Sequence, residues 1–213
     1  SDQGEDVLKK PLTSIEKDRL VVLFLSFILV IVFWGAFEQA GGLMNIYASE
    51  KTDRLFMGWL VPASWFQSLN AMFIIFLGTS VATYWAKRKL KNQLSSSLFK
   101  MIIGLIIMGT GFFFMSAAAT QYESQGSSAM YWLVLAYLFH TIGELCISPV
   151  ALSFITKLAP LKYASLTMGV YFAMTGFGNK LAGWLGEASE NLGEYVICSS
   201  IYNSHNSNNL IAN

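Results

Sequence analysis

The sequence contains little charge. Asp, Glu, Lys and Arg make up 13% of its 213 residues, whereas hydrophobic residues make up 54% and the mean hydropathy is +0.48. An average soluble domain carries about 25% charged residues. The composition therefore indicates an integral membrane protein, with the lipid bilayer as its surroundings. The net charge of +1 points to no particular partner, and we expect no nucleic-acid partner.

The patterns of enzyme and metal sites are also missing. The two cysteines, Cys146 in an apolar run and Cys198 near the end, provide neither a disulfide framework nor zinc-ligand spacing. We expect Cys146 to be a small core residue. No Walker loop and no HExxH motif occurs. Ser148 and His140 lie on one predicted helix and form no nucleophile–base pair. We therefore expect no enzyme activity.

The sequence instead contains long runs of residues without charge. Membrane-crossing helices are predicted at about 13–47, 59–86, 101–122, 129–155 and 164–185. Thr13 and Glu16 match a capping box that would begin the first helix, and Gly41-Gly42 is expected to bend its far end. Pro62 is expected in the first turn of the second helix, where its missing amide does no harm.

The two ends of the chain differ from the uncharged runs. Residues 1–12 are polar, lack an initiating Met and a signal pattern, and are interpreted as a cytoplasmic linker cut from something longer. Residues 13–197 are predicted to form one bundle of five full spans plus the start of a sixth. Residues 198–213 are rich in Asn and Ser, which lipid cannot satisfy, so we expect them to lie outside the fold as a truncated or frameshifted end.

Basic residues indicate the orientation. Of the 14 Lys and Arg, Lys51 and Arg54 fall in a loop on one side, Lys180 falls in the fifth span, and the others fall on the side of the N-terminus. Because cytoplasmic loops carry the excess of Lys and Arg, we expect a multi-pass protein with a cytoplasmic N-terminal end. Lys180 is expected to extend its amine to the outer interface, with a substrate or ion-pair role as the alternative.

Glu38 and Glu144 are the acids that fall within the apolar part of predicted spans, since Glu16 and Asp18 lie in the first turns of the first helix, outside the membrane. A charged group at the bilayer centre costs about 2.5–3.5 kcal/mol on translocon scales and usually faces a cavity, a partner or a proton path. Two such residues in separate spans indicate a shared polar cavity. The alternative is that each carboxyl is protonated and hydrogen-bonded between helices.

Other polar residues occur near these acids in the sequence. His140, Glu144 and Ser148 are spaced by four, so they share one helix face, and Pro149 follows them. Asn70 lies about 17 Å into the second span, near the midplane. A purely structural reading remains open, in which Asn70 joins helices and His140 is a hydrogen-bonded packing residue.

Small residues predict places where helices approach closely. The clearest set repeats every four residues, and a second set is less regular. The two sets are Gly178, Ala182 and Gly186, and Gly104, Gly109 and Gly111.

Several segments resemble the C-terminal half of a bacterial proton-dependent oligopeptide transporter of the major facilitator superfamily. They are residues 33–39 (Phe-Trp-Gly-Ala-Phe-Glu-Gln), the Asn70 span, and residues 143–149, 168–172 and 178–183. The resemblance covers residues 13–197 and implies helices seven to eleven with a stub of helix twelve. The implied fold class is all-α transmembrane, one incomplete six-helix bundle of a twelve-helix transporter.

The resemblance also implies roles for residues in the first and fifth spans. Glu38 matches the acid that takes up and releases the coupled proton. Trp34 and Phe37 match aromatic positions of the substrate pocket. Tyr171 stands where the family often has Trp.

Three further residues match peptide-binding positions of the family. Asn70 matches an amide that contacts the peptide backbone. Glu144 matches the acid that holds the amino terminus of the peptide, and Ser148 follows one turn later. Protons are the implied coupling ion, and no other cofactor is implied.

The predicted function is half of a proton-coupled symporter for di- and tripeptides in the bacterial inner (plasma) membrane. Its implied partner is the missing N-terminal six-helix half, so we do not expect the chain alone to transport. Two alternatives stay open: half of another symporter of the superfamily, for amino acids or nitrate, or a non-functional truncated remnant.

Overall fold

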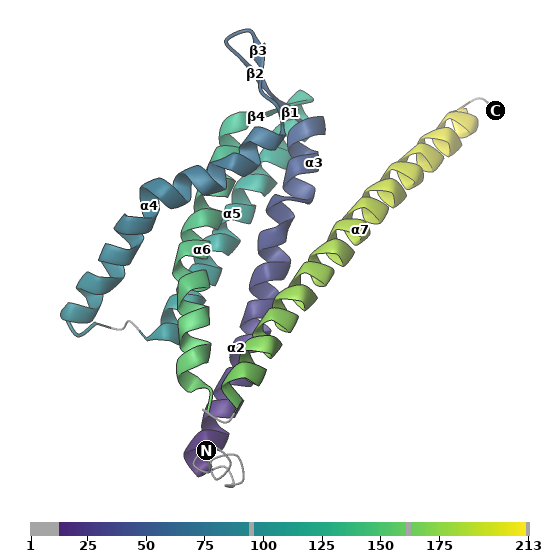
Figure 1. The fold of residues 1–213 in the computed structure, drawn as a ribbon. Coiled ribbons are helices and arrows are strands. Elements are labelled where there is room, and N and C mark those ends of the chain that lie inside the picture. The colour runs from purple at the N-terminus through teal and green to yellow at the C-terminus, as the bar shows by residue number, and fades with distance from the viewer. Residues whose placement is uncertain (1–12, 94–95, 161–162, 212–213) are drawn as a thin grey trace.

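The computed structural model describes residues 13–93, 96–160 and 163–211, with side chains up to residue 188. This part of the chain is nearly all helical. The elements in order are α2 (Ser14–Phe37), η1 (Glu38–Ala40), α3 (Leu43–Glu50), β1 (Thr52–Asp53), β2 (Leu55–Phe56), β3 (Trp59–Leu60), α4 (Ser64–Leu90), α5 (Ser97–Gln125), β4 (Ser128–Ala129), α6 (Met130–Leu158) and α7 (Ala164–Ile211). Helices α2, α5 and α6 run side by side, while α4 and α7 each diverge from them toward one end (Figure 1).

Four helical stretches among the described residues are long and apolar enough to cross a membrane. They are Ser14–Glu50, Ser64–Leu90, Ser97–Gln125 and Met130–Leu158. The fifth predicted span, 164–185, is helical within α7 but is not one of these four. Its apolar residues are diluted by glycines and by Asn179 and Lys180, which lowers its mean hydropathy.

The first helix begins and bends where the sequence predicts. The Thr13 hydroxyl accepts a hydrogen bond from the Glu16 amide at 3.3 Å, and the Glu16 carboxylate accepts one from the Thr13 amide at 2.8 Å. After Phe37 the helix tightens into η1, and the amides of Gly41 and Gly42 both donate to the Glu38 carbonyl at 3.1 Å. The capping box and the bend are therefore confirmed, although one continuous helix to Tyr47 was expected.

The predicted start of the second span at Trp59 is wrong. Strands β2 and β3 form an antiparallel hairpin in which Leu55 pairs with Leu60, and Met57 and Gly58 turn the chain with φ of 51° and 84°. Helix α4 begins only at Ser64, so Pro62 precedes the helix. The error arises because Trp59 and Leu60 are as apolar as the helix that follows, and hydropathy does not separate a short strand from a helical turn.

Two short sheets lie at the end of the bundle opposite the start of α2, and one of them joins two loops (Figure 1). Strand β1 pairs in parallel with β4, with Thr52 opposite Ser128. The Ser128 amide and hydroxyl both bond the Lys51 carbonyl, at 2.9 and 3.2 Å. This pairing fastens the α3–α4 connection to the α5–α6 connection and corrects the expectation of a purely α-helical chain.

Helices α5 and α6 approach closely at glycines. A Cβ added at Gly104 would lie 2.6 Å from Ile147 Cγ1 and 2.8 Å from the Gly143 carbonyl oxygen. A Cβ at Gly111 would lie 2.5 Å from His140 Cδ2, whereas one at Gly109 would meet nothing within 4 Å. The predicted close approach is confirmed at Gly104 and Gly111 and is wrong at Gly109.

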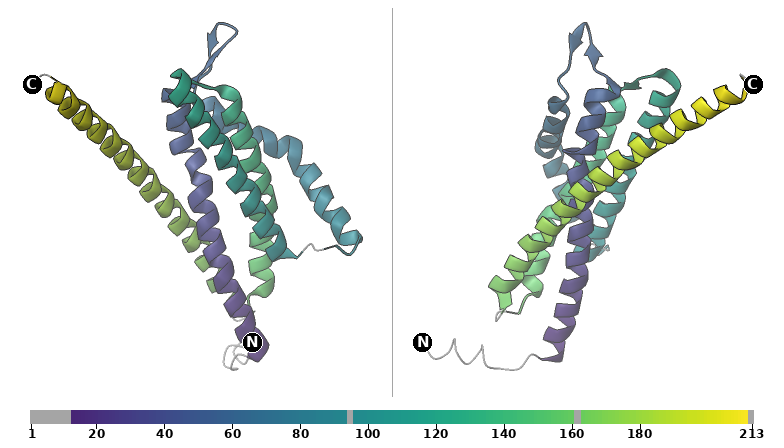
Figure 2. Two further views of the ribbon diagram at one scale, coloured as in Figure 1. Left: turned by 180° about the vertical axis from the view of Figure 1, so that it is seen from behind. Right: turned by 90° about the vertical axis from the view of Figure 1, so that its right-hand side faces the viewer.

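Helix α7 packs against α2 through a second set of small residues. A Cβ added at Gly178 would lie 2.6 Å from Trp34 Cβ, and Ala182 is buried. Gly186 meets nothing within 4 Å, so the predicted seam ends before it. Beyond this point α7 diverges from the other helices (Figure 2).

The end of α7 differs from the prediction. We expected the fifth span to end near residue 185, but the helix continues without a break to Ile211, and no proline follows Pro160 in the sequence. The predicted boundary at residue 198 lies inside this helix. Side chains from residue 189 onward lie outside the described part, so the exclusion of residues 198–213 from the fold stays a prediction. The predicted linker 1–12 also lies outside it.

The core lies where α2, α5, α6 and α7 meet. Its buried members include Phe33 of α2, Met108 of α5, Ile147 of α6 and Tyr171 of α7. Cys146 is also buried, which confirms its predicted place in the interior. Together these contacts fix α6 as the central helix, and its remaining face carries the predicted site.

Candidate functional site

Three polar side chains form a cluster between α4 and α6. The Asn70 amide donates hydrogen bonds to the Glu144 carboxylate at 2.8 Å and to the Thr141 hydroxyl at 3.2 Å. Asn70 and Glu144 are half-buried, whereas Thr141 is fully buried. The structure therefore joins two residues that the sequence singled out separately, and it adds a third.

Thr141 is the residue that the sequence analysis missed. Its hydroxyl donates to the Tyr137 carbonyl at 2.8 Å, which leaves the oxygen lone pair to accept from Asn70. A signal was present, because Thr141 lies three residues before Glu144 and so shares a helix face with it. The bond to Tyr137 fixes the Thr141 rotamer, and Thr141 in turn helps to orient Asn70 toward Glu144.

Glu38 lies in the break between α2 and α3, and hydrogen bonds on both sides hold this segment. The Gln39 side-chain amide donates to the carbonyls of Gly35 at 3.2 Å and of Ala182, on α7, at 3.1 Å. The Tyr137 hydroxyl of α6 donates to the Ala40 carbonyl at 2.6 Å. The backbone around Glu38 is therefore fastened to two other helices. No role was predicted for Tyr137 from the sequence, and Gln39 was marked only as part of the segment 33–39.

The Glu38 segment and Glu144 lie on the same side of α6. Tyr137 contacts Ala40, and Glu144 follows Tyr137 by seven residues, which is two helical turns on one face. Tyr137 and Glu144 are therefore about 10 Å apart along the axis of α6. The Glu38 side chain is half-buried and makes no hydrogen bond to the described residues. No direct contact joins the two carboxyl groups within the described residues.

The predicted aromatic residues pack with one another. The rings of Trp34 and Phe37 lie 5.7 Å apart edge to face, and Phe33 lies 5.3 Å from Trp34. Both Trp34 and Phe37 contact the core cluster that contains the buried Tyr171. The aromatic group therefore extends from the α2–α7 interface to Phe37, the residue before Glu38.

His140 and Ser148 stand apart from the Asn70–Glu144 cluster. The His140 ring is buried against α5, 4.7 Å from the ring of Phe112, and neither ring nitrogen has a partner among the described residues. The buried Ser148 hydroxyl likewise lacks a partner within the described part of the chain. His140 is thus a packing residue but not the hydrogen-bonded one expected. Helix α6 continues through Pro149 to Leu158.

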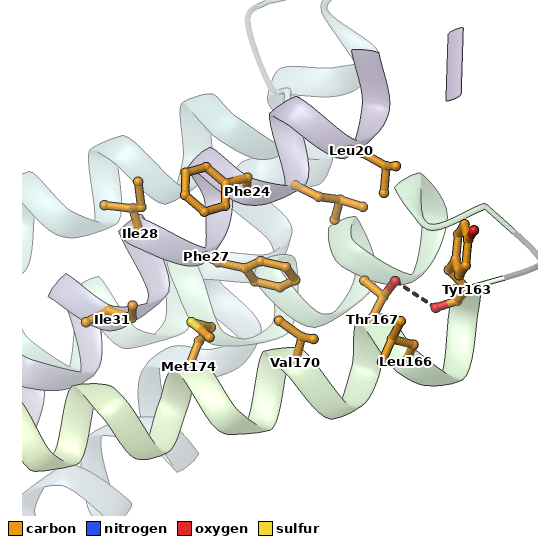
Figure 3. Close-up of a pocket in the computed structure, with 11 residues that line it drawn as sticks. Leu20, Phe24, Phe27, Ile28, Ile31, Tyr163, Leu166, Thr167, Val170 and Met174 are labelled. Atoms are coloured by element: carbon orange, nitrogen blue, oxygen red, sulfur yellow. Dashed lines mark hydrogen bonds between the residues drawn. The ribbon is translucent and has the colours of Figure 1, made fainter. Parts of the chain in front are cut away.

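Two apolar cavities lie away from the polar cluster. One, of about 600 Å³, lies between α2 and α7 and is lined by residues such as Phe24, Phe27 and Met174 (Figure 3). The other, of about 580 Å³, lies beside the β2–β3 hairpin. Neither Glu38 nor Glu144 lines either cavity. In the described ranges, no three His, Cys, Asp or Glu side chains gather in a metal-binding arrangement.

Comparison with known proteins places the chain in one transporter family. The sequence profile of the POT family matches residues 9–194. The chain is 38% identical over 173 residues to the peptide transporter YePEPT of Yersinia enterocolitica, a match that covers 80% of this chain and 34% of that protein. It is 30% identical over 168 residues to a di-/tripeptide transporter of Lactococcus lactis subsp. cremoris, covering 76% of this chain and 33% of that one.

Solved structures agree with these relatives. A crystal structure of a mutant of the peptide transporter POT matches with a TM-score of 0.75 and 29% identity, over 85% of this chain and 36% of that one. A POT transporter in complex with a thioalcohol-conjugated peptide matches with a TM-score of 0.73 and 29% identity, over 87% of this chain and 38% of that one. The chain spans about a third of the length of the curated relatives it matches. The chain belongs to the POT family, and its matched relatives include peptide transporters.

Proposed function

We propose that this chain forms the C-terminal half of a proton-coupled symporter for di- and tripeptides. In this role it supplies one wall of the central peptide cavity in a bacterial inner membrane, with its N-terminal end in the cytoplasm. Membership of the POT family, and four helices that are long and apolar enough to cross a membrane, support peptide transport.

The observation that carries the proposal is the hydrogen bond from Asn70 to Glu144. A carboxylate within a membrane-spanning segment needs a polar partner or a cavity, since hydrocarbon cannot solvate it. Asn70 supplies one such partner and leaves the remaining lone pairs of the carboxylate free. These lone pairs suit the ammonium group of a peptide, because a charge-assisted hydrogen bond is about twice as strong as a neutral one.

Glu38 would carry the coupled proton. Its side chain is half-buried, and its backbone segment is fixed by Gln39 and Tyr137. A carboxyl held at a fixed place but not committed to a hydrogen bond can gain and lose a proton without breaking the fold. If proton and peptide both bind one conformation better than the other, their transport becomes linked. Trp34, Phe37 and Tyr171 would then line the apolar part of the peptide site, and Ser148 would contribute a hydroxyl.

The proposal also includes a partner bundle. The matched relatives are about three times as long as the region they share with this chain. Alternating access requires two bundles to rock around a shared site. We therefore expect the chain to need an N-terminal bundle, supplied in the same or a separate polypeptide, before it can transport.

A reconstitution experiment tests this function. The chain is expressed in a bacterial strain that lacks peptide uptake and requires leucine, with Ala-Leu as the leucine source. It is expressed alone, and together with the part of the Yersinia transporter that precedes the matched region. We expect growth only when both parts are present and both reach the membrane.

The matched control is Glu144→Ala in the same two-part system, which should abolish growth without changing the amount of protein in the membrane. Growth with the Glu144→Ala variant would remove the substrate-binding role of Glu144. Absence of growth with both wild-type parts in the membrane would favour a non-functional remnant.

A further inference from the structure

Basic residues gather where α4 ends and α5 begins, and the function described above uses none of them. No acid occurs in residues 54–122, so neighbours in the sequence do not balance this charge. Apolar stretches of α4 and α5 lie on both sides of the group, which places it at the membrane surface on the side where α2 starts. We call these residues the basic corner: Lys87, Arg88, Lys89, Lys91 and Lys100.

Two members of the basic corner are held over aromatic rings. The Arg88 guanidinium lies 5.8 Å from the centre of the Phe99 ring. The Lys100 amine lies 5.5 Å from the centre of the Trp85 ring. The rings of Trp85 and Phe99 meet edge to face, with their centres 6.3 Å apart. One cation from α4 and one from α5 are therefore held beside the same pair of rings, and both are half-buried.

The start of α5 adds to the positive potential of the basic corner. The N-terminus of an α-helix carries about half a positive charge, and its first amides have no partner within the helix. The Ser96 hydroxyl accepts one of them, from Phe99, at 3.3 Å. The first turn of α5 contains no acid to balance this potential, and Lys100 adds a further positive charge. An anion placed here would lower the electrostatic energy of the folded chain.

Exposed apolar side chains adjoin the basic corner. Phe99, Ile102 and Ile106 are spaced by three and four along α5 and so share one face, on which Ile102 and Ile106 are exposed. At the end of α4, Tyr84 and Leu90 are also exposed. Figure 1 shows that α4 ends away from the other helices, on the side of the bundle opposite α7. Acyl chains can therefore lie along α5 while a head group meets the cations.

We propose that the basic corner binds the head-group phosphate of an anionic phospholipid in the leaflet on the side where α2 starts. The Arg88 guanidinium matches the oxygens of a phosphate in pairs, and Lys100 supplies a second positive charge from the neighbouring helix. Basic sites between membrane-spanning helices bind such head groups. The adjoining apolar surface favours a lipid over a soluble phosphate. This binding is a property separate from peptide transport and does not depend on it.

The test measures lipid affinity by native mass spectrometry of the purified protein in non-ionic detergent. The protein is titrated with phosphatidylglycerol, which is anionic, and with phosphatidylcholine, which is zwitterionic. We expect wild type to bind phosphatidylglycerol at least about ten-fold more tightly. Lys100→Gln should weaken this binding about five-fold, the contribution of one cation near a membrane surface. Lys100→Arg keeps the charge over the Trp85 ring and should keep the affinity.

The matched control is Lys51→Gln, which should leave both affinities unchanged. The Lys51 amine also lies over an aromatic ring, 5.4 Å from the centre of the Tyr122 ring, but it lies at the other end of the bundle and follows Glu50 directly. An equal loss in Lys51→Gln and Lys100→Gln would overturn the proposal, since any lysine would then serve.

Two further arms separate charge from packing and lipid from soluble phosphate. A loss in Lys100→Arg as large as that in Lys100→Gln would show that packing, and not charge, matters, and would overturn the proposal. Glycerol 3-phosphate in excess should not displace phosphatidylglycerol, and full displacement would overturn the lipid assignment in favour of a soluble phosphate. Equal affinity of wild type for the two lipids would remove the head-group site.

Discussion

The contact between Gly104 and Gly143 gives the sharpest prediction for the fold. In Gly104→Ala, the new methyl group would lie 2.6 Å from Ile147 Cγ1, 2.8 Å from the Gly143 carbonyl oxygen and 2.9 Å from Cys146 Cβ. The carbonyl is backbone, so the clash is relieved only if α5 and α6 separate. Overpacking of this kind costs about 1–3 kcal/mol of unfolding free energy. The loss is measured by unfolding in mixed detergent and SDS micelles, followed by tryptophan fluorescence.

Gly109→Ala is the matched control on the same helix, because a Cβ there meets nothing within 4 Å. Replacing a helical glycine with alanine in open space stabilises a helix by up to about 1 kcal/mol. The two variants should therefore change the unfolding free energy in opposite directions. Equal stability of Gly104→Ala and Gly109→Ala would refute the close packing of α5 against α6.

Three further predictions concern the Glu38 segment. In a reconstituted two-part transporter, Glu38→Gln should abolish uphill, proton-driven uptake and keep part of the counterflow exchange, because the Gln side chain does not ionise near neutral pH and so cannot carry the coupled proton. Normal uphill uptake would remove the coupling role. Tyr137→Phe should lower the unfolding free energy by about 0.5–1.5 kcal/mol through loss of its hydrogen bond to Ala40, and unchanged stability would count against that bond. Gln39→Leu should speed amide hydrogen exchange in η1, since the bond to Ala182 is lost, whereas unchanged exchange would show that this bond does not hold the segment.

Local features of the fold were predictable from the sequence. The capping box at Thr13 and the bend at Gly41-Gly42 are set by residues that are neighbours in the chain, and both are confirmed. The start of the second span was not predictable from hydropathy, because Trp59 pairs with Phe56 in a hairpin that depends on the turn at Met57 and Gly58.

The residues of the site were predictable individually, but the contacts between them were not. Asn70 and Glu144 were each recognised as polar residues in apolar helices, but their hydrogen bond depends on the register between α4 and α6. The sequence could not set this register, since it placed the start of α4 at the wrong residue. The links of Gln39 to Ala182 and of Tyr137 to Ala40 join residues far apart in sequence, and no local pattern indicates them.

Packing between helices explains the remaining differences between the sequence predictions and the structure. Gly104 and Gly109 have the same residue type and lie on one helix, yet only Gly104 faces α6. His140 lies one turn before Glu144, yet its ring packs against Phe112 of α5 while Glu144 faces α4. Residues on one face of α6 therefore contact two different helices, α4 and α5. Which residue contacts which helix depends on how the three helices pack together, and no local sequence pattern shows this.

The central claim is that Glu144 holds the amino group of a bound peptide. Titration calorimetry of the purified protein with Ala-Ala and N-acetyl-Ala-Ala tests it most directly. Wild type should bind the free amine at least about ten-fold more tightly, because hydrogen bonds to charged groups contribute about 1.5–3 kcal/mol, and Glu144→Gln should remove most of that difference. Equal binding of both peptides by wild type, or an equal loss for both in Glu144→Gln, would contradict the account.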